Sequence, residues 1–474
     1  MNPIRKTKII CTLGPATESR EMIIKLAEEG MNIVRLNFSH GDHATHGERI
    51  KLINDINTVS GYNLAIMLDT KGPEIRCGEM EGGVLTFKTG ETVNVVKEKV
   101  LGSKERFHVD CPEMFDDIKV GNTLLIDDGK MRLTVLDVKP GILNCRIENS
   151  GIIKTRKGVN VPNVKLSMPF ISEKDEADIR FGCRMDIDFI AASFVRRAQD
   201  VLAIRRILLD EGKSKIQIIA KIENQEGYDN LESILEVADG VMVARGDLGV
   251  EVSTQLVPIY QKKIIKKAND MGKPVITATH MLESMMGNPR PTRAEASDVA
   301  NAVLDGSDCI MLSGETAAGE YPIEAVRTMD IIATAMEEIL PYRERLDAAI
   351  KSSRKTIQDA IGISVADSAL QLDQVKAIIA FTQGGSTARR ISKFRPSVPI
   401  FAVTFTHSVE RKLLLHWGVV PVFSDIQNSM TNDDELASII AKDRGLKAGD
   451  FVIITAGYPT GEGTANMMKI VEVK

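Results

Sequence analysis

A lysine and a glutamate two positions apart end one apolar run of the sequence, in the stretch IIAKIENQEG (218–227). Side chains at positions i and i+2 of a strand point to the same face, so Lys221 and Glu223 would share a face at the end of a buried strand. From this stretch alone two interpretations stay open. The residues form an internal ion pair, or they form a charged site at the mouth of a barrel.

Several other apolar runs also end in side chains that could do chemistry. Glu223 and Asp247 end successive runs, and two carboxylates there would suit Mg²⁺, which binds through a few carboxylates and several waters. The alternative is a pair of acids balanced by Lys221 and Arg35. Arg35 favours bidentate phosphate binding, and Lys221 is either a countercharge to the acids or a partner of a substrate anion.

A second group of strand-end residues is rich in oxygen atoms and has one net negative charge. Its members are Asn37, Ser39, Asp69 and Thr70. That composition suits a weakly held monovalent cation, although loop hydrogen bonding is the better interpretation from the residues alone. Gly246 opens a predicted helix whose amide groups could bind a carboxylate. Thr279, at another strand end, is a helix cap or part of a proton relay.

The elements that carry these residues follow a regular pattern. Continuous apolar runs that alternate with helical segments are typical of a parallel sheet covered on both sides, and eight such units make a (β/α)8 barrel. In such a barrel, functional residues lie at the carboxyl ends of the strands. The runs are at residues 6–14, 32–38, 63–69, 188–194, 217–223, 240–247, 274–281 and 309–315.

Two further regions interrupt or follow this pattern. Residues 71–167 contain β-rich segments and turn signals, which predict a small β domain inserted after the third strand. After about residue 345, strand-like runs with helices between them predict an open α/β domain. The fold class is therefore α/β: a (β/α)8 TIM barrel (1–70 and 168–345) with an inserted small β-barrel lid (71–167) and a C-terminal α/β regulatory domain (346–474).

One loop of the C-terminal region has the pattern of a phosphate cradle, because a glycine- and hydroxyl-rich loop joins a strand to a helix. It lacks the GK[ST] ending of a Walker A motif, and it could also be a simple turn. Its distance along the chain from the barrel residues suggests a separate ligand. The loop comprises Thr382, Gln383, Gly384, Gly385, Ser386 and Thr387.

Composition narrows the class of protein. The net charge of −5 argues against general nucleic-acid binding. The six cysteines are scattered without a C-x-x-C pair, which favours a reduced, cytoplasmic protein over a disulfide framework or zinc site. No segment reaches the ~20 apolar residues of a membrane helix, and the beginning of the chain does not have the pattern of a signal peptide. The histidines outside the candidate site show no metal-ligand spacing and are expected to have surface roles: His43, His46, His108, His407 and His416.

The ordered set of motifs MNIVRLNFSHG, LDTKGPEIR, KIENQEG, MVARGDLGVE and NPRPTRAEASDVANAVLDG resembles the pyruvate kinase family over essentially the whole chain. The resemblance implies transfer of a phosphoryl group from phosphoenolpyruvate to ADP, giving pyruvate and ATP, with a homotetramer as the assembly. The chain resembles the bacterial type of the family, and we expect no extra C-terminal domain after Lys474.

The resemblance also implies a role for each candidate residue. Glu223 and Asp247 would bind Mg²⁺ or Mn²⁺, and Lys221 and Arg35 would contact the transferring phosphoryl group. Gly246, Asp247 and Thr279 would hold the substrate carboxylate, and Thr279 would join the proton path to the enolate. The remaining implied roles are nucleotide binding by Asn37, His40, Arg76 and Lys157, K⁺ binding by Asn37, Ser39, Asp69 and Thr70, and K⁺ dependence linked to Glu74.

The loop at 382–387 resembles the family's effector site for a sugar phosphate or nucleotide, with residues 457–463 as a covering loop. One departure is His280, where many members have Gln; strand alternation predicts that it faces away from Thr279. Two other functions stay open. A metal-dependent pyruvate-binding aldolase or lyase would not need the lid, the K⁺ group or Arg76, and a metabolite sensor without catalysis would have lost Lys221, Glu223 or Asp247.

Overall fold

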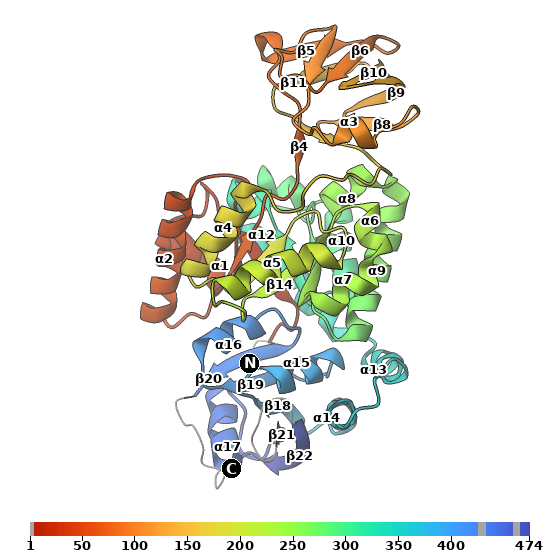
Figure 1. The fold of residues 1–474 in the computed structure, drawn as a ribbon. Helices are drawn as coiled ribbons and strands as arrows, with labels where there is room; N and C mark the ends of the chain where they lie inside the picture. Colours follow the sequence, from red (N-terminus) through yellow and green to blue (C-terminus); the bar gives the residue numbers. More distant parts are fainter. Residues whose placement is uncertain (1–3, 425–432, 458–464) are drawn as a thin grey trace.

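The structure, a computed structural model, describes residues 4–424, 433–457 and 465–474. Figure 1 shows three parts stacked along one direction, with a β domain above a central barrel and an α/β domain below it. The inserted domain is joined to the barrel by narrow connections, whereas the C-terminal domain lies directly against the opposite end of the barrel.

The eight apolar runs of the sequence form the eight parallel strands of the closed barrel, which confirms the predicted fold class. The strands pair around the barrel in the order β1-β17-β16-β15-β14-β13-β3-β2. Their bounds are β1 (Lys8–Thr12), β2 (Met31–Asn37), β3 (Ala65–Asp69), β13 (Phe189–Ala192), β14 (Gln217–Ile222), β15 (Gly240–Ala244), β16 (Val275–Ala278) and β17 (Cys309–Leu312).

Helices surround the barrel and bury its outer face, because each places an apolar stripe against the strands. The main helices are α1 (Arg20–Glu28), α2 (His43–Val59), α4 (Glu173–Arg184), α5 (Ala198–Asp210), α7 (Leu231–Val237), α9 (Val257–Met271), α10 (Arg293–Asp305) and α12 (Pro322–Glu338). Shorter helices follow some strands: α6 (Gln225–Asp229), α8 (Arg245–Glu251), η2 (Thr254–Leu256), η3 (Glu283–Met286) and α11 (Gly314–Ala317). Side chains cap several helices; Thr292 and Glu295 form a capping box at the start of α10.

The inserted β domain follows β3, at the carboxyl end of the barrel strands, as predicted. It has its own apolar core. Its strands form a seven-stranded sheet in the order β4-β12-β8-β9-β10-β6-β7 and a two-stranded sheet, β11-β5. The elements are β4 (Ile75–Arg76), η1 (Glu81–Gly83), β5 (Val84–Phe87), β6 (Thr92–Val96), β7 (Arg106–His108), α3 (Met114–Asp117), β8 (Thr123–Ile126), β9 (Met131–Lys139), β10 (Ile142–Ile147), β11 (Gly151–Lys154) and β12 (Gly158–Asn160).

The C-terminal domain is an open α/β sheet in the order β20-β19-β18-β21-β22, with β22 antiparallel to β21. Figure 1 shows α15 and α16 on the side of this sheet that faces the barrel. The elements are α13 (Tyr342–Lys351), α14 (Ile357–Gln371), β18 (Val375–Phe381), α15 (Ser386–Lys393), β19 (Ile400–Thr404), α16 (His407–Leu413), β20 (Val419–Phe423), α17 (Asp433–Asp443), β21 (Phe451–Gly457) and β22 (Ala465–Glu472). The domain boundaries near residues 70, 168 and 345 stay predictions.

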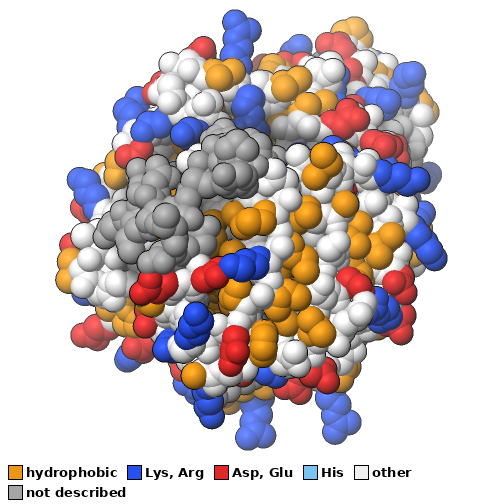
Figure 2. Space-filling view, turned by 90° about the horizontal axis from the view of Figure 1, so that it is seen from below, with side chains coloured by type: hydrophobic (Ala, Val, Ile, Leu, Met, Phe, Trp, Pro, Cys, Tyr) orange, Lys and Arg blue, Asp and Glu red, His pale blue; other side chains and the backbone are white. Residues whose placement is uncertain are grey.

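The lower end of the barrel is closed by the C-terminal domain. Leu414 and Leu415 join the apolar cluster inside the barrel, and Arg411 forms an ion pair with buried Asp188. Figure 2 shows that hydrophobic side chains gather on the underside of the molecule. Ile357 of the C-terminal domain is one apolar side chain that is mostly exposed, with an exposed fraction of 69%. None of the helices in the described part of the chain has the length and apolar character of a membrane span.

Candidate active site

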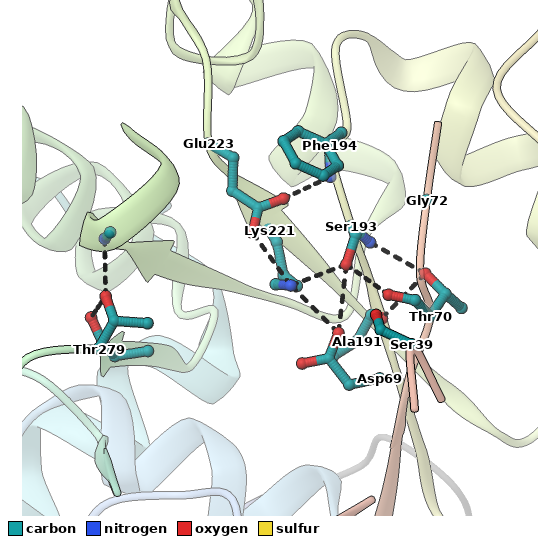
Figure 3. Close-up of polar contacts among 12 residues, drawn as sticks. Ser39, Asp69, Thr70, Gly72, Ala191, Ser193, Phe194, Lys221, Glu223 and Thr279 are labelled. Carbon is teal, nitrogen blue, oxygen red and sulfur yellow. Dashed lines mark hydrogen bonds and ion pairs between the residues drawn. The ribbon is translucent and has the colours of Figure 1, made fainter. Parts of the chain in front are cut away.

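The barrel brings the polar strand ends together at one mouth, on the side of the inserted domain. Figure 3 shows Asp69, Thr70, Ser193, Lys221 and Glu223 converging there from neighbouring segments, with Thr279 across the opening. The order of strands explains this meeting: β13 lies between β3 and β14, so the end of β13 lies between Asp69 and Lys221.

Lys221 is the central cation of the mouth and is nearly buried. Its Nζ donates to Ser193 Oγ at 2.7 Å and to Asp69 Oδ1 at 3.1 Å, and it lies 3.0 Å from Glu223 Oε1. Burial lowers the pKa of Lys221, but the carboxylates of Asp69 and Glu223 outweigh that effect and raise the pKa above its ordinary value. Lys221 is therefore a permanent positive charge at neutral pH, as stabilisation of a substrate anion requires.

Glu223 has no solvent-exposed surface. Its Oε2 accepts a hydrogen bond from the Phe194 amide at 2.5 Å, whereas Oε1 accepts none in spite of the nearby Lys221 ammonium, because that contact lacks hydrogen-bond geometry. Burial raises the pKa of Glu223 to about 7, with Lys221 opposing the shift and Asp247 adding to it. A buried carboxylate oxygen that accepts no hydrogen bond is costly, and it is the kind of ligand that a divalent cation would satisfy.

Asp247 lies in the first turn of α8, close enough to raise the pKa values of both Glu223 and Lys221. The structure thus brings the two predicted metal-binding carboxylates to one site. Among the described residues no group of three or more His, Cys, Asp or Glu side chains could hold a metal ion. Glu223 and Asp247 fit Mg²⁺ or Mn²⁺ only with water and substrate oxygens as further ligands, which is how Mg²⁺ is commonly bound.

Arg35 and Asp69 form an ion pair beside Lys221. Arg35 Nε lies 2.6 Å from Asp69 Oδ2, and an Arg35 terminal nitrogen donates to Thr12 Oγ1 at 3.0 Å. Burial would raise the pKa of Asp69, but the charges of Arg35 and Lys221 lower it. Asp69 therefore stays ionised and orients both cations, and the remaining guanidinium nitrogen of Arg35 has no hydrogen bond to another described residue.

The predicted K⁺ residues lie on the adjacent strands β2 and β3, where Asn37 is directly opposite Asp69. Asn37 Oδ1 accepts from the Ser39 amide at 3.1 Å, and Thr70 Oγ1 accepts from the Ser193 amide at 3.1 Å. The four residues are thus close in the fold, but several of their oxygens already have protein donors. Their role in binding K⁺ stays a prediction.

Thr279 and Gly246 contact each other at the far side of the mouth. The Gly246 amide donates to Thr279 Oγ1 at 2.7 Å, and that hydroxyl donates to the Ala278 carbonyl at 2.6 Å. The amide predicted to bind a carboxylate therefore has an internal partner in this conformation. Arg245 holds the loop by donating to the Thr279 carbonyl at 2.7 Å.

The prediction that His280 faces away from Thr279 is wrong. Strand β16 ends at Ala278, and both Thr279 and His280 have positive φ, at 68° and 53°. The alternation of side chains does not extend past the strand, and atoms of both residues lie 3.5–3.6 Å from where a Cβ on Gly246 would be.

The predicted nucleotide-binding residues are divided between two domains. Arg76 and Lys157 lie on neighbouring segments of the inserted domain, where Arg76 pairs with Glu74 at 2.6 Å and Lys157 with Asp127 at 2.9 Å. Asn37 and His40 lie at the end of β2 in the barrel. Among the hydrogen bonds and ion pairs of the described residues, none joins Asn37 or His40 to Arg76 or Lys157.

A cleft of about 280 Å³ separates the inserted domain from the barrel. Glu74 and Asn160 line it from the inserted domain, and Asp247 and Glu251 line it from the barrel. Asn160 donates to Glu251 Oε1 at 2.8 Å across this junction. Burial raises the pKa of Glu251 in spite of that hydrogen bond. The inserted domain therefore already contacts the site through one polar bridge.

Two site residues were missed by sequence reasoning. Ser193 connects Lys221 to β3, because its Oγ accepts from Lys221 and lies 2.6 Å from the Thr70 carbonyl, to which it donates. Thr12 supports Arg35 from the end of β1. The sequence did contain one sign of these residues, because the apolar runs of the first and fourth strands also end near a hydroxyl side chain. Neither Thr12 nor Ser193 has a charged residue beside it in the sequence, so neither was selected.

The predicted effector loop joins β18 to α15, as expected for a phosphate cradle. Gly385, at the start of α15, has φ +82°, a conformation that favours glycine. Thr382 and Thr387 are largely buried. The predicted covering segment at 457–463 lies outside the described residues except for Gly457. All six cysteines are free and buried, which agrees with the predicted lack of a disulfide framework.

Comparison with known proteins assigns the family. The family model of the pyruvate kinase barrel domain matches residues 4–326, and that of the pyruvate kinase alpha/beta domain matches residues 359–471. Pyruvate kinases of Geobacillus stearothermophilus and Bacillus licheniformis are 53% and 52% identical to this chain, over 98% of its length and 80% of theirs.

A crystal structure of a pyruvate kinase from Cryptosporidium parvum superimposes with a TM-score of 0.95 and 41% identity, over 99% of this chain and 96% of that one. These matches give no support to the alternative aldolase or lyase function. Together with a barrel mouth that holds a buried lysine between carboxylates, they lead to one assignment: this chain belongs to the pyruvate kinase family.

Proposed function

We propose that this chain transfers the phosphoryl group of phosphoenolpyruvate to ADP at the barrel mouth, giving pyruvate and ATP. Its family makes it a phosphotransferase of glycolysis. The observation that carries the assignment of the site is the position of Lys221, a buried ammonium held by Ser193, Asp69 and Glu223. Phosphoryl transfer depends mainly on positioning and on stabilisation of oxygen charge.

Lys221 and Arg35 provide the positive side of the site. Lys221 is fixed by three partners, so its charge needs little reorganisation when negative charge develops on the phosphoryl and enolate oxygens. Arg35 is held by Asp69 and Thr12, and its planar guanidinium suits two phosphate oxygens at once. Together they orient the transferring group.

Glu223 and Asp247 are the proposed ligands of Mg²⁺ or Mn²⁺, and Glu223 Oε1, which has an ion pair with Lys221 but accepts no hydrogen bond, supports this role. When bound, the divalent cation polarises phosphoryl and enolate oxygens as a Lewis acid. Asn37, Ser39, Asp69 and Thr70 are the proposed K⁺ ligands. All of these oxygen donors suit hard cations.

Thr279 and the Gly246 amide are proposed to bind the substrate carboxylate together with the Asp247 amide. Because the Gly246 amide now donates to Thr279 Oγ1, carboxylate binding requires that hydroxyl to rotate. The rotated hydroxyl can then donate to substrate and take part in protonating the enolate. Arg245 acts as a positioning residue, since it fixes the Thr279 carbonyl.

The inserted domain is proposed to close over the mouth as a lid and to exclude water. Arg76 and Lys157 would then approach the nucleotide from above, and Asn37 and His40 from the barrel. The hydrogen bond between Asn160 and Glu251 already joins the inserted domain to the barrel at this cleft. Closure would narrow the cleft between the domains.

We further propose a phosphorylated effector at residues 382–387, a homotetramer as the assembly, and a cytoplasmic location. The glycine- and hydroxyl-rich loop at the start of α15 supports the first. Exposed apolar side chains of the C-terminal domain, including Ile357 and Ile470, support association between copies of the chain.

The test of the site is Lys221→Met in a coupled assay with phosphoenolpyruvate, ADP, Mg²⁺ and K⁺. We expect turnover to fall by at least about 10²-fold, the usual effect of removing one preorganised electrostatic group. Metal-dependent binding of phosphoenolpyruvate should survive. Lys266→Met is the matched control, because Lys266 is an exposed lysine on α9 whose one ion pair within the described part of the chain is with Asp270.

Wild-type-like turnover of Lys221→Met would refute the role of Lys221. Failure of the wild-type chain to form pyruvate under these conditions would refute the proposed reaction itself. The two failures are distinguishable, because the second is measured without any substitution.

A further inference from the structure

The loop at residues 38–42 joins β2 to α2 and carries His40, one of the proposed nucleotide-binding residues. The amides of this loop are held by the barrel strands. The Phe38 amide donates to the Asp69 carbonyl of β3 at 3.0 Å. The Ser39 amide donates to Asn37 Oδ1 at 3.1 Å, and the His40 amide donates to the Asn37 carbonyl at 3.2 Å. The carbonyls of the loop take their partners from two helices instead.

Lys174, in the first turn of α4, holds the first of these carbonyls. Its Nζ donates to the Phe38 carbonyl at 2.8 Å and pairs with Asp178, four positions later on α4, at 2.5 Å. Asp178 is buried and also accepts from His43 Nε2 at 2.7 Å. The carbonyl and the amide of a trans peptide point in opposite directions. A fixed Phe38 carbonyl therefore also fixes the direction of the Ser39 amide.

His46, on α2, holds the second carbonyl. Its Nε2 lies 2.8 Å from the His40 carbonyl oxygen, so Nε2 carries a proton and donates it. Burial lowers the pKa of His46, so the ring is neutral at pH 7, and it stacks on Phe38 with the ring centroids 4.0 Å apart. The prediction of surface roles is wrong for His46 and for His416, whose side chains are both buried.

Gly41 allows the loop to pass close to His46. Its φ of +78° favours glycine, and a Cβ at this position would lie 3.2 Å from His46 Nε2. Asp42 then caps α2 by accepting from the Thr45 amide at 2.9 Å. The loop therefore packs tightly against the helix that carries His46.

The first turn of α4 also supports the inserted domain, below which Figure 1 places this helix. Asp175, next to Lys174, is buried and accepts from the Gly72 amide at 3.1 Å. Gly72 lies between β3 and Arg76 of β4, the nucleotide-binding residue proposed for the lid. One turn of α4 therefore contacts the segments that carry both halves of the proposed nucleotide site.

We propose that Lys174 and His46 are positioning residues for nucleotide binding, because they hold the Phe38 and His40 carbonyls and so fix the loop at residues 38–42 in the orientation that binds ADP. This inference rests on the proposed function, in which Asn37 and His40 contact the nucleotide. Neither Lys174 nor His46 needs to touch the nucleotide itself.

Loss of either contact would let the loop adopt other peptide orientations. Binding of ADP would then have to order the loop again, which costs affinity. Lys221 and Thr279, proposed to bind phosphoenolpyruvate, lie on other segments of the barrel. The inference therefore predicts a loss that is selective for the nucleotide.

The experiment compares Lys174→Met with the wild-type full-length chain at saturating Mg²⁺ and K⁺. Calorimetry without phosphoenolpyruvate gives the Kd of ADP, and the coupled assay gives the KM values of ADP and phosphoenolpyruvate. We expect the Kd and KM of ADP to rise about tenfold, the effect of one lost hydrogen bond to a charged group, and the KM of phosphoenolpyruvate to stay within twofold. Lys174→Arg, which keeps a charged donor, should keep the Kd of ADP within threefold of wild type.

Lys266→Met is again the matched control, because Lys266 on α9 also pairs with an acid four positions later, Asp270. It should leave all three constants unchanged. His46→Leu should reproduce the selective loss of ADP binding, and His46→Gln, whose amide can donate from the place of Nε2, should restore binding. The Lys174 side chain is 47% exposed, so Lys174→Met tests the inference even if the variants of buried His46 do not fold.

Hydrogen exchange observes the loop without any ligand. The amides of residues 38–42 should exchange faster in Lys174→Met but not in Lys266→Met. The inference is overturned if Lys174→Met binds ADP like wild type, or if its KM for phosphoenolpyruvate rises as much as its KM for ADP. A wild-type chain that neither binds ADP nor forms pyruvate would instead refute the proposed function, and that result is measured without any substitution.

Discussion

Glu223→Gln should change how the stability of the metal-free protein depends on pH. The substitution keeps the size of the side chain and removes its charge. Burial raises the pKa of Glu223 to about 7 from an ordinary value of 4.5. The folded protein thus binds this proton more tightly than the unfolded chain does, so its contribution to stability is present below pH 4.5 and is lost as the pH rises toward 7.

The magnitude follows from that shift. A difference of about 2.5 pH units corresponds to about 3 kcal/mol, at 1.36 kcal/mol for each unit. At pH 5 protonated Glu223 and Gln are nearly equivalent, so wild type and variant should have similar free energies of unfolding. By pH 8 the variant should be more stable than wild type by about 3 kcal/mol, because the wild type then contains a carboxylate that burial disfavours.

The assay is urea unfolding followed by circular dichroism at pH 5, 6, 7 and 8 in EDTA. Saturating Mg²⁺ should abolish much of the difference at pH 8, since a ligand that binds only the folded state stabilises it. Parallel pH profiles for wild type and Glu223→Gln would refute the reasoning, because Glu223 would then have the same pKa in both states. Lys266→Met serves again as a control without a change in the site.

Two further predictions concern positioning residues. Ser193→Ala removes a hydrogen-bond partner of Lys221. We expect kcat to fall about tenfold, the effect of one lost hydrogen bond to a charged group, and KM to change little. An unchanged kcat would contradict the role of Ser193. Asp188→Asn breaks the ion pair with Arg411 and should destabilise the junction of barrel and C-terminal domain by about 3 kcal/mol. The single tryptophan, Trp417, donates its amide to Asp308 of the barrel, so its fluorescence should change at a lower urea concentration in that variant but not in Lys447→Gln, which changes an exposed lysine of the C-terminal domain.

The barrel was predictable from sequence because each strand is a continuous apolar run, and a buried parallel strand needs apolar side chains on both faces. The residues at the strand ends followed from the same runs. Ser193 could not be identified in this way, because its importance depends on β13 lying between β3 and β14. That neighbourhood is a property of the closed barrel, and the hydroxyl at the end of the fourth run does not by itself reveal it.

Local rules also failed where the backbone leaves the regular strand. Alternation placed Thr279 and His280 on opposite faces, but positive φ at both residues redirects their side chains toward Gly246. A cleft of about 520 Å³ between the barrel and the C-terminal domain, lined by Lys215 and Lys412, was beyond sequence reasoning for a different reason. Lys215 and Lys412 are 197 positions apart in the sequence, and neither belongs to a recognisable motif. They line the same cleft because α16 packs against the barrel.

The charges at the mouth explain why Lys221 and Glu223 do not simply neutralise each other in the empty site. Lys221 and Arg35 contribute two positive charges, and Asp69, Glu223 and Asp247 contribute three negative charges when all are ionised. The cluster then has a net charge of −1, which repels a phosphate dianion and attracts a divalent cation. Phosphoenolpyruvate should therefore bind weakly without divalent metal and tightly with it, while in Glu223→Gln, with a neutral cluster, metal-independent binding should become stronger.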